Sequence, residues 1–332
     1  MVSRMEPFLD DQETCSHAYA PNFTIINARV TGPLVSHLDR PVDVTGKGHH
    51  SEDVLAKLYG EAAERVSLLA PDANEEWTAL DPLTDLRRHI RPLEFFGDRW
   101  RVNSHGCAAH NRSEVSRLLA VEELLERRAV QDWWEGRCEM RPIEFDSDFE
   151  HKLEKLVEWS RRDAPVYRKT AFFSITDTPF TKVVAAVSHD AHFDQIAVAF
   201  AAGGNTGKVC QKALEELLQV ELNTRRLDVA RTNTPVDDLP QSLRDIRDQQ
   251  DEFKSRLTPL FQTPDPPARI RLPDQSYTNS NEILDALASA GCPVLLIDMT
   301  HPKIGIPTTR AIFSDPDQNP FARYSAKDRI PL

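Results

Sequence analysis

The sequence Glu61-Ala62-Ala63-Glu64-Arg65 recurs, with the same charged positions, as Glu123-Leu124-Leu125-Glu126-Arg127. Residues three positions apart lie on one face of an α-helix, so each segment presents two carboxylates side by side if it is helical. Neighbouring like charges destabilise a helix unless a cation lies between them, and hard oxygen ligands are typical of Mg²⁺ sites. The repeated segment therefore predicts a magnesium site between two helices, although a solvated helix face would explain either copy alone. A di-iron bundle is disfavoured, because it needs Glu-x-x-His and no His follows either pair at that spacing.

Both segments lie within helices that the surrounding residues predict. Ser51 precedes two acidic residues and an apolar run, which predicts an N-cap and a helix that ends near Leu69. Over Ser113–Trp134, apolar residues recur at intervals of three and four, and this spacing predicts a long second helix. Between the two helices, residues 95–102 predict a pair of strands joined by a tight turn.

The second half of the chain alternates predicted strands and helices. Residues 194–202 form an apolar run that leads into Gly203-Gly204-Asn205 and then into a predicted helix at about residues 208–225. A strand, a glycine loop and a helix in this order are typical of α/β proteins. By the same criteria, strands are predicted at residues 171–175, 182–187, 294–298 and 309–313, and helices at residues 149–162 and 282–290. Residues 228–276 are rich in Pro, Asp and Gln, so we expect an exposed excursion with one polar helix near residues 237–261.

The overall composition is that of a folded protein and restricts its partners. The chain has 332 residues, 40% of them hydrophobic and 28% charged, and its formal net charge is −12. Excess negative charge repels nucleic acid and anionic lipid, so neither is expected as a partner. No apolar run reaches the roughly 18 to 20 residues that span a bilayer, and the N-terminus lacks a hydrophobic signal core, so we expect no membrane association and a cytoplasmic location. The five cysteines are far apart and form no C-x-x-C motif, which indicates reduced thiols.

Further pieces of sequence accompany the repeated segments in a fixed order. Gly46-Lys47-Gly48 precedes the first segment, and Gly106-Cys107-Ala108-Ala109-His110-Asn111 precedes the second. A third piece follows at residues 212–219, and a strand, turn and strand at residues 295–310 close the set. Together these pieces resemble the YcaO-domain family over about residues 40–315.

The resemblance implies a YcaO-like fold of the α/β class with α+β character, in which mixed sheets are flanked by helices. In that fold the nucleotide is held between the helices that carry the Glu-x-x-Glu pairs, and Mg²⁺ ions bridge these carboxylates to the phosphates of ATP. By this analogy the expected metal ligands are Glu61, Glu64, Glu123 and Glu126. The residues expected along the nucleotide are Asn111, Lys212, Glu216, Arg65 and Arg127. The charges agree with this assignment, since acidic side chains approach phosphates only through bridging cations.

The chemistry implied by the resemblance is ATP-dependent modification of a backbone amide in a ribosomally made precursor peptide. In characterised relatives a Cys, Ser or Thr side chain, or a sulfide donor, attacks the carbonyl carbon, and the amide oxygen is phosphorylated. Loss of phosphate then leaves an azoline ring, by cyclodehydration, or a thioamide. The expected enzyme is thus a peptide cyclodehydratase or thioamide synthetase, and the sequence names no catalytic residue.

The expected organisation is an N-terminal tail or edge segment at residues 1–40, followed by a YcaO-like ATP-binding domain at residues 41–332. The first segment is too short for a peptide-recognition module. We therefore expect a separately encoded leader-binding partner, either E1-like or TfuA-like, and a precursor peptide as the substrate. A homodimer would be compatible with the sequence.

Two alternatives remain open at this point. Where the family usually has Asn, Gly and Arg, this chain has His105, His110 and Lys212. Lysine keeps the charge of arginine but loses its planar fork of donors. These departures are compatible with a nucleotide-binding accessory protein that supports a partner enzyme without turning over ATP. A scaffold with solvated carboxylate faces is the third hypothesis, and it predicts no Mg²⁺-dependent nucleotide affinity.

Overall fold

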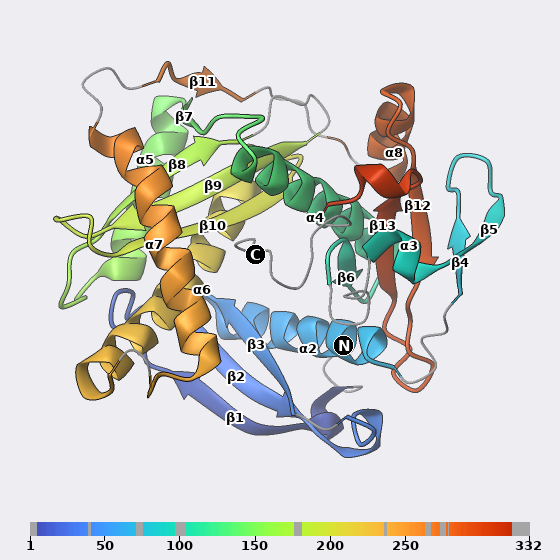
Figure 1. Ribbon diagram of the computed structural model, residues 1–332, viewed down its shortest axis with the longest axis horizontal. Coiled ribbons are helices and arrows are strands. Elements are labelled where there is room, and N and C mark those ends of the chain that lie inside the picture. Colours follow the sequence, from blue (N-terminus) through green and yellow to red (C-terminus); the bar gives the residue numbers. More distant parts are fainter. Residues whose placement is uncertain are drawn as a thin grey trace.

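The described part of the chain folds into three sheets and seven α-helices, α2 to α8 (Figure 1). The computed structural model describes residues 5–38, 41–70, 76–96, 104–175, 181–235, 238–262, 267–272, 277 and 279–320. The strand pairs within these residues are antiparallel except for the pairing of β7 with β11. The predicted class, mixed sheets flanked by helices, is therefore confirmed.

The first sheet lies at the bottom of Figure 1 under helix α2 (Ser51–Leu68). Its strand order is β1-β2-β3, with β1 at Leu9–Cys15, β2 at Thr24–Val30 and β3 at Val42–Gly48. Gly46 permits close packing of α2, because a Cβ atom there would lie 2.2 Å from the carbonyl oxygen of Val54. Residues 1–40 thus contribute two strands to this sheet, and the domain boundary at residue 40 stays a prediction.

The second sheet has helices on both faces. Its order is β10-β9-β8-β7-β11, with β7 at Arg141–Glu144, β8 at Lys169–Ser174, β9 at Lys182–His189, β10 at Ile196–Gly203 and β11 at Ile270–Arg271. Helices α5 (Ser147–Arg161) and α6 (Thr206–Asn233) pack on one face, and α4 (Ser113–Trp134) and α7 (Gln241–Gln262) pack on the other. Every residue of β9 and β10 is buried, which explains the uninterrupted apolar runs in their sequences.

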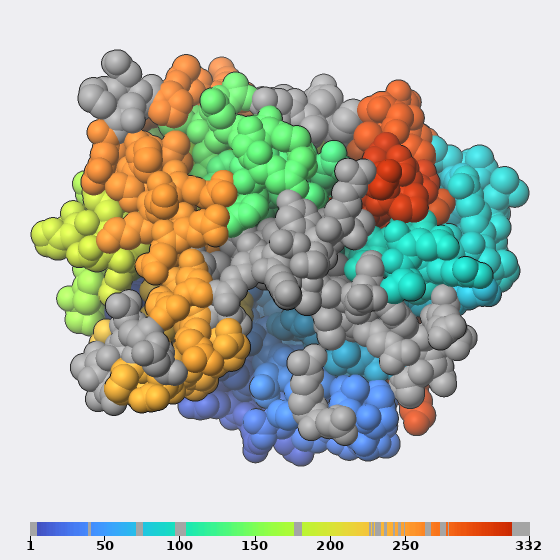
Figure 2. All heavy atoms as spheres, in the orientation of Figure 1, coloured from blue at the N-terminus to red at the C-terminus, as the bar shows by residue number. Residues whose placement is uncertain are grey.

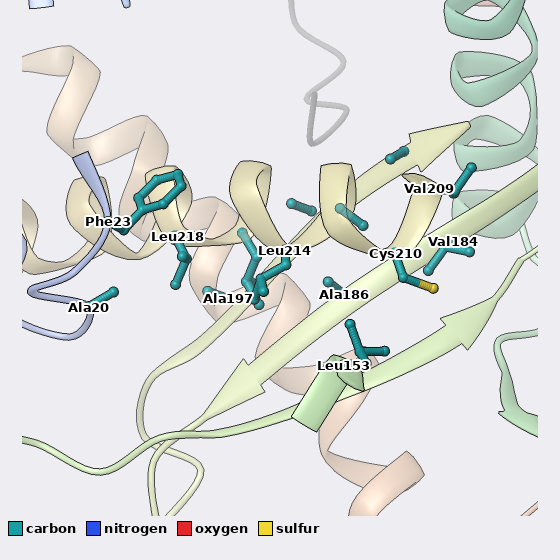
Figure 3. Close-up of a cluster of buried hydrophobic side chains, with 14 of the residues drawn as sticks. Ala20, Phe23, Leu153, Val184, Ala186, Ala197, Val209, Cys210, Leu214 and Leu218 are labelled. Atoms are coloured by element: carbon teal, nitrogen blue, oxygen red, sulfur yellow. The ribbon is translucent and has the colours of Figure 1, made fainter. Parts of the chain in front are cut away.

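Helix α6 is anchored to this sheet by an apolar stripe. Figure 3 shows Cys210, Leu214 and Leu218 directed toward Ala186 of β9 and Ala197 of β10. The small alanine side chains leave room for the helix, and each buried leucine stabilises the contact by about 1.5 to 3 kcal/mol. The position of α6 relative to the sheet is therefore fixed along most of its length.

The predicted glycine loop joins β10 to α6. Asn205 caps the helix, since its side-chain Oδ1 accepts a hydrogen bond from the backbone N–H of Lys208 at 3.0 Å. A Cβ atom at Gly203 would lie 2.8 Å from the side chain of Val209, so any larger residue there would displace Val209. The loop is thus a tight strand-to-helix turn, and the helix starts two residues earlier than predicted, at Thr206.

The third sheet lies on the other side of α4 (Figure 1). Its order is β5-β4-β12-β13-β6, with β4 at Trp77–Leu80, β5 at Arg87–Ile90, β6 at Cys107–Ala109, β12 at Val294–Asp298 and β13 at Thr308–Phe313. Helices α4 and α8 (Ser280–Ser289) pack on one face, and α3 (Pro92–Phe96) packs on the other. Helix α4 therefore contacts both five-stranded sheets and is the central element of the molecule.

Three sequence predictions need correction. The first helix has His50 as its N-cap, not Ser51, and no side chain caps it. Phe95 and Phe96 belong to helix α3 rather than to a strand, because both side chains are buried in the apolar cluster against the third sheet. Residues 97–103 lie outside the described residues. Residues 228–276 are not simply an exposed excursion, since Phe253 and Leu257 of α7 are buried against the second sheet.

The remaining predicted helices and buried strands agree with the structure to within a few residues, apart from the longer α6. Figure 2 shows α7, in orange, as a ridge on one face and the β4–β5 hairpin, in cyan, at the opposite edge. No helix among the described residues is both long and apolar enough to cross a membrane.

Candidate functional site

The two Glu-x-x-Glu pairs come together because α2 and α4 are neighbours, with strand β6 in contact with both helices. Glu64 of α2 and Glu123 of α4 are close enough for their charges to repel, and α6 approaches the same place from the second sheet (Figure 1). The tertiary structure thus gathers three of the predicted sequence pieces around one point.

The α2 pair is held in place by backbone and arginine contacts. Glu61 Oε2 accepts a hydrogen bond from the backbone N–H of Thr45 at 3.1 Å. Arg65 Nη2 lies 3.7 Å from Glu61 Oε1, one helical turn away. This arrangement leaves Glu64 facing α4 without a hydrogen-bond donor among the described residues.

The α4 pair has a similar arrangement. Glu126 Oε2 accepts a hydrogen bond from the backbone N–H of Ala202 at 3.1 Å, which links the helix to the end of β10. Arg127 Nη2 lies 3.6 Å from Glu123 Oε1 and 3.8 Å from Glu126 Oε1. These separations are longer than good charge-assisted hydrogen bonds, so the arginine balances the two charges without holding either carboxylate tightly.

Helix α6 adds the remaining charges. Lys212 interacts electrostatically with four carboxylates, those of Glu122, Glu123, Glu126 and Glu216. Glu216 in turn pairs with Lys47 of β3, whose ammonium group also donates to Gln219. Lys47 was not singled out from the sequence as a site residue, although it stands between the two glycines of the first matching piece.

These side chains border a cavity of about 250 Å³. Its polar wall contains Glu123, Glu126, Arg127, Lys212 and Glu216. Most of the other lining residues are apolar, and they include Phe200 of β10 and Phe253 of α7. Five predicted site residues therefore share one cavity, and Phe253, from the segment that was expected to be an exposed excursion, forms part of its lining.

Burial alters the ionisation of the clustered carboxylates. It raises the pKa of Glu64 well above the usual range, with a further contribution from the charge of Glu123. Burial also raises the pKa of Glu123 to about 7. For Glu216, burial opposes ionisation, but Lys47 and Lys212 outweigh it and the pKa is lowered. The cluster thus holds more carboxylate than its own cations neutralise, which favours a bound cation.

Arg310 of β13 lies beside this cluster and was missed as a site residue. Its side chain is fully buried, and none of its three guanidinium nitrogens has a hydrogen-bond partner among the described residues. The guanidinium carbon lies 3.7 Å from the ring centre of Phe96, and the carboxylates of Glu64 and Glu123 are among its electrostatic neighbours. In the sequence, Arg310 is a charged residue within the strand predicted at residues 309–313, and this position could have indicated a functional role.

The residues present fit a complex of Mg²⁺ with an anionic phosphate group. Buried guanidinium N–H groups without partners favour an anion, and the excess carboxylates favour a cation. In the part of the chain that the structure describes, no three His, Cys, Asp or Glu side chains converge closely enough to hold a metal ion by themselves. Phosphate oxygens would then have to complete the coordination of the ion, as is usual for Mg²⁺.

The sequence piece before the second repeated segment contributes two further residues, the predicted nucleotide residue Asn111 and Cys107, whose thiol lies near Glu64, Glu123 and Arg310. Asn111 is exposed in the turn before α4, and no described hydrogen bond joins it to Lys212 or Glu216. Cys107, which adjoins the second repeated segment, is completely buried in β6, and burial raises the pKa of its thiol well above the usual range. That environment disfavours a nucleophilic thiolate.

Comparison with known proteins gives the same family from independent observations. Residues 69–315 match the family model described as YcaO cyclodehydratase, ATP- and Mg²⁺-binding. No curated protein sequence gave a significant match.

The fold also resembles solved structures. The structure of YcaO from Methanopyrus kandleri bound with AMPPCP and Mg²⁺ has a TM-score of 0.70 at 15% identity, covering 99% of this chain and 93% of the other. A heterocyclase in complex with substrate and cofactor has a TM-score of 0.69 at 17% identity, covering 94% of this chain, which spans only 51% of the heterocyclase. The E. coli microcin synthetase McbBCD complex has a TM-score of 0.57 at 12% identity, covering 88% of this chain and 84% of the other. On the family match and this fold, the chain belongs to the YcaO family, whose cofactors are ATP and Mg²⁺.

Proposed function

We propose that this protein uses Mg-ATP to phosphorylate, and so activate, a backbone amide of a ribosomally made precursor peptide. The observation that carries the proposal is the partly buried cluster of two Glu-x-x-Glu pairs beside the fully buried Arg310, whose guanidinium nitrogens have no described partner. In a member of a family described as ATP- and Mg²⁺-binding cyclodehydratases, this pairing of excess carboxylate and unsatisfied cation suits a metal-bound triphosphate.

Each predicted site residue then has a role in binding or orientation. Glu61, Glu64, Glu123 and Glu126 would hold Mg²⁺, and Arg65, Arg127, Lys212, Glu216 and Asn111 would lie along the nucleotide. Bound Mg-ATP supplies a phosphoryl donor, and the amide oxygen is a better leaving group once it is phosphorylated. The buried Arg310 and the partly buried Arg127 and Lys212 are in place before the reaction, so they would stabilise negative charge in the transition state with little reorganisation.

The product of the reaction would be an azoline ring or a thioamide. A side-chain hydroxyl or thiol of the peptide gives the ring by loss of water, whereas a sulfide donor exchanges the amide oxygen for sulfur. A heterocyclase with bound substrate and a microcin synthetase complex with pro-MccB17 bound have the same fold, which supports a peptide substrate and partner proteins for this chain as well. The proposed partner is a separate leader-binding protein, either E1-like or TfuA-like, and the proposed location is the cytoplasm.

The first test is to titrate the protein with ATP in the presence and in the absence of Mg²⁺, and to monitor binding by calorimetry or thermal unfolding. The wild type should be stabilised only when both are present, and Glu64→Gln and Glu126→Gln should each reduce the affinity at least tenfold. Glu114→Gln is the matched control, because Glu114 lies exposed on α4 away from the cavity. An unchanged affinity in both site variants would contradict the assignment of the carboxylates.

The second test separates an enzyme from an accessory protein. The protein is combined with its precursor peptide and leader-binding partner, and both phosphate release and peptide mass are followed. Loss of water indicates an azoline, and exchange of oxygen for sulfur indicates a thioamide. Tight Mg-ATP binding without phosphate release would favour the accessory role, for which the replacement of the usual arginine by Lys212 is the supporting observation.

A further inference from the structure

Strand β10 lies at the end of the second sheet and has one edge that no described strand covers. The sheet order is β10-β9-β8-β7-β11, so β9 is the one described neighbour of β10. Three consecutive residues of β10, Val198, Ala199 and Phe200, line the cavity that contains Lys212 and the α4 carboxylates. Consecutive side chains of a strand point to opposite faces of the sheet, so all three can line one cavity only where the cavity follows the edge of the strand. The free edge of β10 therefore forms one side of the candidate site.

The direction of the backbone groups on this edge follows from one hydrogen bond. In an antiparallel ladder, each residue directs its N–H and its C=O toward the same side, and the side alternates from one residue to the next. The N–H of Ala202 points away from β9, because it donates to Glu126 of α4 at 3.1 Å. The N–H and C=O groups of Phe200 and Val198, two and four residues earlier, therefore point to the free edge as well.

Helix α4 covers only one end of this edge. Glu126 accepts a hydrogen bond from the N–H of Ala202, and Glu122, one helical turn earlier, accepts one from the N–H of Gly204. At Val198 and Phe200, no described group forms a hydrogen bond with the free edge. Val198 is 4% exposed and Phe200 is 8% exposed, and backbone polar groups that are this deeply buried are nearly always paired. The uncovered part of the edge thus favours a ligand that supplies backbone donors and acceptors.

The space beside the edge suits an extended peptide with small side chains. Helices α4, α6 and α7 border this space, and away from the charged cluster the helices contribute Val220, Gln250 and Phe253 to its lining. These walls are largely apolar and the cavity holds only about 250 Å³, so the space disfavours large or charged side chains. A folded protein surface could not reach backbone groups that are so deeply buried, whereas an added strand needs only a narrow slot.

The free edge also leads to the charged cluster. Two residues of a strand span about 7 Å, so a peptide residue opposite Ala202 would lie about 7 Å beyond the one opposite Phe200. Ala202 is the residue whose N–H donates to Glu126, and Lys212 lines the same cavity. A strand held at Val198 and Phe200 would therefore bring its next amides to the carboxylates and to Lys212, where the proposed phosphoryl donor binds.

We infer that the free edge of β10 binds the reacting segment of the precursor peptide as an added strand, which pairs with Val198 and Phe200 and consists of small, uncharged residues. The backbone pairing positions the amide that is to be activated, and it tolerates different peptide sequences. The narrow apolar space selects small residues next to the reacting one. The identity of the ligand as a precursor peptide rests on the proposed function, whereas the free edge itself does not.

The test uses a labelled hexapeptide of alternating alanine and serine as the probe, with the full-length protein. Binding is measured by fluorescence anisotropy, and hydrogen exchange of the Val198 and Phe200 amides is followed by NMR. We expect saturable binding that slows exchange at both amides. A hexapeptide of alternating lysine and serine should bind about tenfold more weakly or worse, because the apolar walls cannot solvate its charges. The alanine–serine peptide with methylated backbone nitrogens should not bind, because it cannot donate to a strand edge.

The matched variants are Val198→Pro and Val198→Ala. Both lose the valine side chain, but only proline loses the N–H that points to the free edge, and proline is tolerated where the N–H faces away from the neighbouring strand. Val198→Pro should weaken probe binding about tenfold or more, and Val198→Ala by less than about threefold. Thermal unfolding without ligand checks that both variants fold. If Val198→Pro does not fold, the methylated probe tests the same hydrogen bonds on the wild type.

Three results would overturn the inference. The first is equal affinity of the two folded Val198 variants for the probe, and the second is binding of the methylated or the lysine–serine peptide as tight as that of the probe. The third is probe binding that leaves exchange at Val198 and Phe200 unchanged.

Mg-ATP binding, measured on the same samples, separates this inference from the proposed function. Intact Mg-ATP affinity of the wild type without probe binding would refute the free edge as a peptide site and leave the nucleotide site in place. Probe binding without Mg-ATP affinity would refute the proposed function and leave the edge of β10 as a peptide-binding site.

Discussion

Replacement of Arg310 by methionine should stabilise the protein alone and abolish its stabilisation by Mg-ATP. Burial lowers the pKa of Arg310 from 12.5 to about 10, and at about 1.4 kcal/mol for each pH unit this corresponds to roughly 3 kcal/mol against the charged side chain in the folded state. Cation–π attraction to the ring of Phe96 offsets up to about 2 kcal/mol of this cost. The net gain on substitution is therefore about 1 kcal/mol, which is an increase in Tm of about 2 °C.

The effect of ligand should have the opposite sign. At a nucleotide concentration one hundred times the Kd, binding stabilises the wild type by about 2.7 kcal/mol, and Arg310→Met should lose most of this because the triphosphate loses its buried cation. Differential scanning calorimetry with and without Mg-ATP measures both effects on the same sample. Arg117→Met is the control, since Arg117 is exposed on α4 and should change either value by less than about 0.5 kcal/mol.

Two results would refute this reasoning. If Arg310→Met lowers the Tm of the ligand-free protein by several degrees, the guanidinium group already makes stabilising interactions in the ligand-free protein. It would then not be an unpaired cation available to bind an anion. If the variant keeps the full Mg-ATP shift, Arg310 does not contact the nucleotide even though it lies beside the carboxylate cluster. An intermediate variant, Arg310→Lys, keeps the charge and should retain part of the ligand shift.

Three further predictions follow from burial and packing. Burial raises the pKa of Glu123 to about 7, so Mg-ATP binding should release protons near pH 7, and the affinity should weaken as the pH falls below 7. Calorimetry in two buffers of different ionisation enthalpy measures this proton release. The Glu123→Gln variant should show no release. Burial opposes ionisation of Glu221, but Arg161 outweighs it and the folded-state pKa is lowered, so its contribution is present above the unfolded pKa and is lost as the pH falls through the folded value. Glu221→Gln should therefore destabilise by about 3 to 5 kcal/mol in urea unfolding at pH 7, and by less under acid conditions. Gly46→Ala should destabilise the protein by more than about 2 kcal/mol, because the new Cβ would lie 2.2 Å from a backbone oxygen. Gly60→Ala should stabilise it by about 0.5 to 1 kcal/mol, because Gly60 lies inside α2 and its Cβ would be 3.7 Å from the carbonyl oxygen of Ala109, an ordinary contact.

Local patterns in the sequence determined the elements that carry the site. The spacing of apolar residues gave the helix at Ser113–Trp134 without error, and the Glu-x-x-Glu-Arg segments were correctly placed on helices. The order of the matching pieces was enough to indicate the family. These features depend on residues a few positions apart, and such short-range regularities are visible in one dimension.

Other elements depended on neighbours that are remote in the chain. Phe95 and Phe96 looked like strand residues, but the ring of Trp77 and the third sheet bury them in a short helix. Helix α7 looked polar and exposed, yet the second sheet buries Phe253. In each case a few apolar side chains were enough to fix the element, because burial against an existing sheet outweighs local propensity.

The sequence by itself determined which residue types the candidate site contains, and the tertiary structure decided which of them meet. The repulsion between Glu64 and Glu123, and the unsatisfied guanidinium of Arg310, arise from the packing of α2, α4 and β13. The physical reason is that helix and strand periods are set by covalent geometry within a segment, whereas burial, charge neighbours and free hydrogen-bonding edges are set by segments that are distant in sequence.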